Sequence, residues 1–223
     1  MPSSSFGHKD EILPIWPKLS KSPVLTRLGW SNLAHSAVKT NQALLGPAST
    51  HKPSTTEDLH SRIDGLLVIH IRRGDFLEHC ENLGHWGAGF LAFNQFPEFV
   101  DKWESPQGDD EQKMAVYLRR CLPTIQQIVH KVEQVRQTQV ARGLKKIYIM
   151  TNGDPIWLKQ LKTALEEAYM WESIASSRDL VLTPMEKYVS YTTDMLIGQK
   201  AQVFIGNGVS SISHLLKKIQ HLT

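Results

Sequence analysis

Short apolar runs and apolar residues at helical spacing alternate along the chain after residue 65. The apolar runs predict strands at 66–71, 147–150, 179–183 and 203–205. The helically spaced residues predict helices at 123–143, 155–168, 188–199 and 212–219. This alternation of strand and helix predicts an α/β fold, with a Rossmann-like parallel sheet and helices on both of its faces.

Prolines and a glycine mark the ends of two predicted helices. Pro123 fits the first helical position, where a missing N–H does no harm, and Gly143 fits the C-terminal end of the same helix. Pro155 starts the next helix in the same way.

Residues 1–60 and 76–111 do not follow this alternation. The first stretch is interrupted by six prolines, with a weak helical pattern at 25–45 and a linker-like composition at 46–57. The second stretch contains many glycine and aromatic residues and predicts a long irregular loop, of a kind that is usually functional. We therefore divide the chain into an N-terminal region with a linker, residues 1–60, and an α/β domain, residues 61–223.

Composition and charge narrow the class of protein. The chain has 223 residues, of which 41% are hydrophobic and 21% are charged, a mixture typical of globular domains. Its net charge of +3 is too small to indicate a nucleic-acid partner, and no stripe of Lys and Arg is interleaved with aromatic residues. No apolar stretch reaches about 18 residues, so we expect no membrane segment in this chain. The first residues also lack the apolar core of a signal peptide.

The strongest candidate for a functional site is the end of the first predicted strand, where the apolar run passes into His70, Arg72, Arg73 and Asp75. Ligands of open α/β sheets bind outside the carboxyl ends of the strands. Arg offers a planar fork of donors that matches phosphate oxygens, so two of them form a clamp for a diphosphate. Because neighbouring strand residues face opposite sides, one Arg can face a ligand while a carboxylate such as Asp75 holds the other. A surface ion pair at a strand end is the alternative.

A second candidate follows the last predicted strand, where Gly206-Asn207-Gly208 leads to Ser210 and Ser211 at the start of a helix. Glycines allow the backbone to approach a ligand closely, and a helix N-terminus favours an anion. The alternative is that the two serines are ordinary helix caps.

The remaining polar groups give weaker signals. Cys80 and Cys121 are the only cysteines. They are either two buried thiols or one disulfide, which would indicate an oxidising compartment. No His pair accompanies them and the histidines have no metal-ligand spacing, so we expect no metal site. Asp194, taken alone, fits a solvated helix residue, and Thr151-Asn152-Gly153 fits a turn.

Two of these segments together resemble a known family. Residues 70–76, His-Ile-Arg-Arg-Gly-Asp-Phe, resemble the His-x-Arg-Arg-x-Asp-Phe segment of the GDP-fucose protein O-fucosyltransferases. Residues 194–211, an Asp-led helix that leads to Phe-Ile-Gly-Asn-Gly-Val-Ser-Ser, look like the second segment of that family. Residues 149–152 fit its intermediate strand, and the order and separation of the segments agree over residues 64–219.

The resemblance implies the C-terminal half of a GT-B glycosyltransferase. Such an enzyme would transfer fucose with inversion from GDP-fucose to a Ser or Thr hydroxyl of an acceptor protein or glycan, without a metal or another cofactor. The family match implies that Arg72 is catalytic and contacts the diphosphate. It implies donor binding by His70, Arg73, Asp75, Asp194, Asn207, Ser210 and Ser211.

The resemblance has two further implications. Members of the family work in the secretory pathway, in the ER or the Golgi, so we expect that location. The family has a full N-terminal domain before its first motif, whereas only 69 residues precede His70 here, so we expect a truncated chain. A non-catalytic module that binds a nucleotide, a glycan or a protein is the alternative to an active enzyme.

Overall fold

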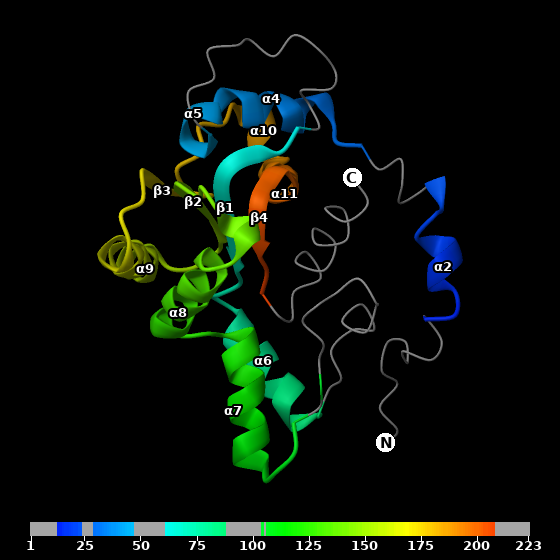
Figure 1. Ribbon diagram of the computed structural model, residues 1–223. Helices are drawn as coiled ribbons and strands as arrows, with labels where there is room; N and C mark the ends of the chain where they lie inside the picture. Colours follow the sequence, from blue (N-terminus) through cyan, green and yellow to red (C-terminus); the bar gives the residue numbers. More distant parts are fainter. Residues whose placement is uncertain (1–12, 24–28, 47–60, 88–103, 105, 208–223) are drawn as a thin grey trace.

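The computed structural model describes residues 13–23, 29–46, 61–87, 104 and 106–207. Within these residues the chain forms a parallel four-stranded sheet in the order β3-β2-β1-β4, with helices packed against it (Figure 1). The strands are β1 (Ile63–Ile71), β2 (Lys146–Thr151), β3 (Ser173–Ser176) and β4 (Ala201–Ile205). The strand order reverses beside β1, because the chain builds outward from β1 to β3 and then returns to place β4 on the other side.

Helices of very different lengths precede β1 and connect the strands. Over the described residues they are α2 (Trp16–Leu19), α4 (Asn32–Thr40), α5 (Gln42–Leu45), α6 (Phe76–His85), α7 (Asp110–Cys121), α8 (Ile125–Arg136), η3 (Gln139–Ala141), α9 (Pro155–Ala168), α10 (Pro184–Lys187) and α11 (Ser190–Lys200). None of the helices described is long and apolar enough to cross a membrane.

The alternation of apolar side chains along β1 explains how both faces of the sheet are covered. Side chains alternate along a strand, so Leu66 and Val68 point to one face while Leu67, Ile69 and Ile71 point to the other. The first face packs against α4, α5 and α11, and the second packs against α8 and α9. All five of these strand residues are buried, as a central parallel strand requires. The predicted Rossmann-like sheet with helices on both faces is therefore confirmed.

The predicted strand at 179–183 is wrong, and β3 lies a few residues earlier at Ser173–Ser176. The segment reads as a strand because of Leu180 and Val181, but Val181 is 69% exposed. The side chain of Asn41 accepts from Val181 N at 2.8 Å and donates to Val181 O at 2.9 Å. A side-chain amide thus takes the hydrogen bonds that a neighbouring strand would otherwise supply.

The predicted helix at 123–143 has different limits and α7 precedes it. The helix α8 begins after Thr124, whose hydroxyl accepts from Gln127 N while the Gln127 side chain accepts from Thr124 N. This capping box places Pro123 outside the helix, so its predicted role as first helical residue is wrong. Gly143 does not end α8 but forms a later turn, with φ of +83°.

The predicted irregular loop at 76–111 is also partly wrong, because α6 occupies its first ten residues. Residues 88–103 of that loop lie outside the described residues. The helices α6 and α7 pack together, and a disulfide between Cys80 and Cys121 joins them, with the Cα atoms 5.7 Å apart. Of the two states that the sequence left open for the cysteines, the structure has the bonded one.

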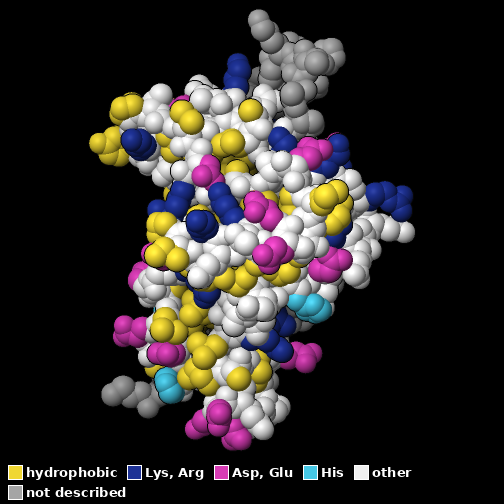
Figure 2. All heavy atoms as spheres, turned by 90° about the vertical axis from the view of Figure 1, so that its left-hand side faces the viewer, with side chains coloured by type: hydrophobic (Ala, Val, Ile, Leu, Met, Phe, Trp, Pro, Cys, Tyr) yellow, Lys and Arg dark blue, Asp and Glu magenta, His cyan; other side chains and the backbone are white. Residues whose placement is uncertain are grey.

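Part of the N-terminal region belongs to the core of the sheet. Ala34 and Val38 of α4 and Leu45 of α5 lie in the same hydrophobic cluster as Leu66 and Val68. Residues 47–60, where we predict the linker, lie outside the described residues, so the domain boundary at residue 60 stays a prediction. On the face that Figure 2 presents, basic and acidic side chains are interspersed and form no patch of a single sign.

Candidate functional site at the carboxyl end of the sheet

A small polar network surrounds the end of β1. The Arg72 side chain contacts the Asp75 carboxylate with Nη2 3.2 Å from Oδ1. Asn152, which follows β2, accepts from Arg73 N at 2.8 Å and donates to Asp75 Oδ1 at 3.4 Å. The ends of the neighbouring strands β1 and β2 therefore converge at one edge of the sheet.

The turn that closes this network requires a glycine. Gly74 has a φ of +64°, in the left-handed region that other residues rarely adopt. A Cβ atom at this position would lie 3.2 Å from Asn152 Nδ2. Glycine allows the turn to carry Asp75 back toward Arg72 while Asn152 packs closely beneath it.

The two arginines leave β1 on opposite sides, as the strand period predicts. The Arg73 guanidinium lies over the ring of Trp157 on α9, 4.3 Å from its centroid, and burial lowers the pKa of Arg73. Arg72 lies 5.6 Å from the Phe76 ring and keeps 37% of its side chain exposed. Arg73 is therefore held against the protein, whereas Arg72 is the cation that can meet a ligand.

Asp194 is held on α11 by one residue of β2 and by the residue that follows β3. Tyr148 Oη of β2 donates to Asp194 Oδ1 at 2.5 Å, and Ser177 Oγ donates to Oδ2 at 2.8 Å. Burial raises the pKa of Asp194 to about 6, although both hydrogen bonds act in the opposite direction. Burial, together with the nearby Asp194 charge, also raises the pKa of Tyr148, so its hydroxyl keeps the proton that it donates.

His70 lies in β1, two residues before Arg72, but its environment differs. The side chain is buried, and burial followed by the charge of Arg72 lowers the pKa of His70 to about 4. His70 is therefore a neutral imidazole near pH 7, with one donating and one accepting nitrogen.

The pKa shifts of Asp194 and His70 predict opposing pH dependences of stability. The folded-state pKa of Asp194 is raised from 3.8 to about 6, so its ionisation makes stability fall as pH rises through that range. The folded-state pKa of His70 is lowered from 6.5 to about 4, so its contribution makes stability rise with pH over nearly the same range. The two contributions offset each other in the wild-type chain.

We expect single substitutions to reveal each contribution. In Asp194→Asn the free energy of unfolding should rise more steeply with pH between 4 and 6.5 than in the wild type. In His70→Gln it should instead fall over this range. Urea unfolding at several pH values measures both slopes, and equal slopes in all three proteins would contradict the assignment.

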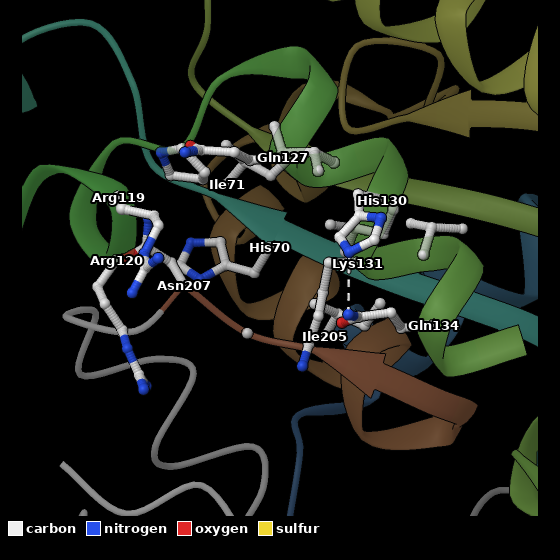
Figure 3. A pocket seen from close by; sticks show the side chains of 15 residues that line it. His70, Ile71, Arg119, Arg120, Gln127, His130, Lys131, Gln134, Ile205 and Asn207 are labelled. Atoms are coloured by element: carbon white, nitrogen blue, oxygen red, sulfur yellow. Dashed lines mark hydrogen bonds between the residues drawn. The ribbon is translucent and has the colours of Figure 1, made fainter. Parts of the chain in front are cut away.

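A cavity of about 520 Å³ opens between the carboxyl ends of β1 and β4 (Figure 3). His70 and Asn207 contribute to its wall, near Arg119 and Arg120 of α7. Asn207 is buried and donates from Nδ2 to the carbonyl oxygen of Cys121 at 2.9 Å, which ties the end of β4 to the end of α7.

The structure thus separates the predicted site residues into groups. Arg72, Arg73 and Asp75 form the strand-end network, Asp194 lies on α11, and none of these four lines the cavity. Tyr191, one turn before Asp194 on α11, lies within electrostatic range of both Arg72 and Asp194. Ser210 and Ser211 lie outside the described residues, so their place at the phosphates stays a prediction.

Several groups at these sites were missed from the sequence. Tyr148 and Ser177 hold Asp194. In the sequence Tyr148 looks like an ordinary strand residue and Ser177 carries no signal, so only the fold reveals these contacts. Arg119 and Arg120 were missed because α7 itself was missed. Over the part of the chain that the structure describes, no cluster of three or more His, Cys, Asp or Glu residues could hold a metal ion.

The fold and its strand-end groups define the class of Rossmann-like α/β proteins, and comparisons with known proteins give the family. A family model described as GDP-fucose protein O-fucosyltransferase matches residues 32–222. The chain belongs to this family. A comparison with curated proteins gave no match.

Solved structures support the same fold. A structure of POFUT1 in complex with GDP has 19% sequence identity and a TM-score of 0.54, and the alignment covers 88% of this chain and 46% of that chain. A complex of POFUT1 with GDP-fucose gives 19% and 0.51, covering 88% and 44% of the two chains. The chain therefore has the Rossmann-like α/β fold of a part of a GT-B fucosyltransferase, and it spans less than half the length of these structures.

Proposed function

We propose that this chain carries the donor site of an inverting O-fucosyltransferase, which transfers fucose from GDP-fucose to a Ser or Thr hydroxyl without a metal. The observation that carries the proposal is the partly exposed Arg72 guanidinium, held by Asp75 at the carboxyl end of β1 in a chain of the O-fucosyltransferase family. The POFUT1 structures with GDP and GDP-fucose support the choice of donor.

Arg72 suits the charge that develops during this reaction. As the bond from fucose C1 to the β-phosphate oxygen breaks, that oxygen gains negative charge and the sugar becomes cationic. The acceptor oxygen forms the new bond to C1 from the opposite face and loses its proton to a base. A guanidinium already held in place stabilises the departing diphosphate without reorganising, and such groups contribute about 3–4 kcal/mol each.

The other predicted residues fit supporting roles. Asp75 and Asn152 orient Arg72 and the turn after β1, while Arg73 fixes this turn against Trp157. We assign Asp194 to the nucleoside, because an ionised carboxylate accepts the N–H groups on the edge of guanine. We place Asn207, Ser210 and Ser211 near the phosphates, on the basis of the family motif.

We also propose that the protein works in an oxidising compartment of the secretory pathway, the ER or the Golgi. The Cys80–Cys121 disulfide supports this location, because disulfides persist in oxidising compartments and are rare in the cytosol.

A transfer assay tests the proposed activity. The chain is incubated with GDP-fucose labelled in the fucose and with a folded acceptor domain that contains Ser and Thr, in the presence of EDTA. We expect label on the acceptor, unchanged by the chelator. Loss of transfer on chelation would contradict the metal-free mechanism. GDP binding without transfer or hydrolysis would instead identify a non-catalytic nucleotide-binding module.

A further inference from the structure

The segments that follow β1 and β4 lie beyond the point where these two strands pair. The pairing register of the strands ends at Ile69 and Ile205. Arg72 comes three residues after Ile69, and Asn207 comes two residues after Ile205. Since the hydrogen bonds between β1 and β4 end before both residues, the position of one segment relative to the other depends on other contacts.

One set of contacts leads from Arg72 to the disulfide through α6. Asp75 and Phe76 at the start of this helix both contact Arg72, Asp75 by its carboxylate and Phe76 by its ring. Cys80 lies four positions after Phe76, so the two side chains share one side of the helix. The disulfide is therefore attached one helical turn away from a group that contacts Arg72.

A second set of contacts leads from the disulfide to the end of β4. The helix α7 lies beside α6, and Cys121 is its last residue, so the carbonyl oxygen of Cys121 has no partner within the helix (Figure 1). Asn207 Nδ2 donates to this oxygen at 2.9 Å, across 86 positions of sequence. Water or a nearby residue serves an ordinary helix end, whereas here a buried amide from a distant strand end does so. The hydrogen bond thus ties the chain after β4 to the disulfide.

We propose that the disulfide and Asn207 form a positioning link, which holds the end of β4 in a fixed place relative to Arg72 and so raises the affinity for the donor. The role of this link rests on the proposed donor function of Arg72. Groups that are already fixed lose less entropy when a ligand binds, so a site built from two strand ends gains affinity when the ends are joined. A disulfide that only stabilises α6 and α7 would leave the affinity of the folded chain unchanged.

The reciprocity of coupled equilibria gives a direct test. If the disulfide raises the affinity for GDP by a given factor, GDP favours the disulfide over the two thiols by the same factor. The full chain is equilibrated with reduced and oxidised dithiothreitol, which exchanges two electrons and two protons with the disulfide, and its thiols are counted by alkylation and mass spectrometry. We expect saturating GDP to shift the equilibrium constant at least tenfold toward the disulfide, which is about 30 mV for a two-electron couple. No shift in a chain that binds GDP would overturn the inference and leave the donor site intact.

Two asparagine variants separate the link from general stabilisation of the fold. Asn207→Ala removes the hydrogen bond to Cys121 and keeps the disulfide, so GDP should shift its thiol–disulfide equilibrium less than twofold. Asn41→Ala is the matched control, because Asn41 is also buried and its amide bonds the backbone of a distant residue, Val181. We expect this control to show the wild-type shift. A tenfold shift that persists in Asn207→Ala would overturn the inference, because it would come from stabilisation of the whole chain.

Hydrogen–deuterium exchange without ligand gives a readout that is independent of the donor. In Cys80→Ala/Cys121→Ala we expect exchange to increase more in peptides that cover residues 70–76 and 201–207 than in a peptide that covers residues 147–150. If this double variant does not fold, Asn207→Ala replaces it, with the same expectation for residues 201–207. An equal increase in all peptides, or none, would overturn the inference. A wild-type chain that binds no GDP would overturn both the inference and the proposed function.

Discussion

Replacing Arg72 with Ala should abolish the rise in melting temperature that GDP gives at the donor site and should lower fucosyl transfer about 100- to 1,000-fold. The reason is that the Arg72 side chain is the partly exposed cation at the end of β1, while Arg73 is held against Trp157. Thermal unfolding with and without GDP, and the transfer assay described above, measure the two effects.

Two comparisons make the Arg72 result specific. Arg72→Lys keeps the charge but loses the planar fork of donors, so it should recover only part of the binding. Arg142→Ala removes an exposed arginine elsewhere and should leave both the GDP response and transfer unchanged. An Arg72→Ala protein with the wild-type response to GDP would rule out the assigned role.

Removing the disulfide should produce the largest loss of stability. Cys80 and Cys121 are separated by 41 positions, and closing a loop of this length contributes about 4 kcal/mol in the chain-entropy description. We expect Cys80→Ala/Cys121→Ala to lower the free energy of unfolding by about that amount, as measured by urea denaturation. The helices α6 and α7 depend on it most, because α7 buries only Tyr117 and Cys121.

Reduction of the wild-type protein provides the control. A reductant should lower its stability to nearly that of the double alanine variant and should have no effect on the variant. A loss below about 1 kcal/mol in both experiments would show that the bond adds little to the fold.

Most of the central sheet could be predicted because the sequence of each of its strands and helices carries a local pattern. β1 and β2 each contain a short apolar run, and α9 starts at a proline and repeats apolar residues at helical spacing. β3 was missed because Ser-Ile-Ala-Ser is short and half polar, and its pairing with β2 decides its structure. A capping box formed by Asp109 and Gln112 was the available signal for α7.

The candidate site could be predicted only in part. The opposite directions of Arg72 and Arg73 follow from the period of a strand. By contrast, the raised pKa of Asp194 depends on burial, and its partners Tyr148 and Ser177 are far away in the sequence. The same holds for the cavity, which combines the ends of β1 and β4 with α7 and α8.

Hydrogen–deuterium exchange with and without GDP tests most directly whether the donor binds at the carboxyl end of β1. The account predicts slower exchange on GDP binding in peptides that cover residues 70–76 and 190–196. Saturable GDP binding that leaves exchange in both segments unchanged would contradict it.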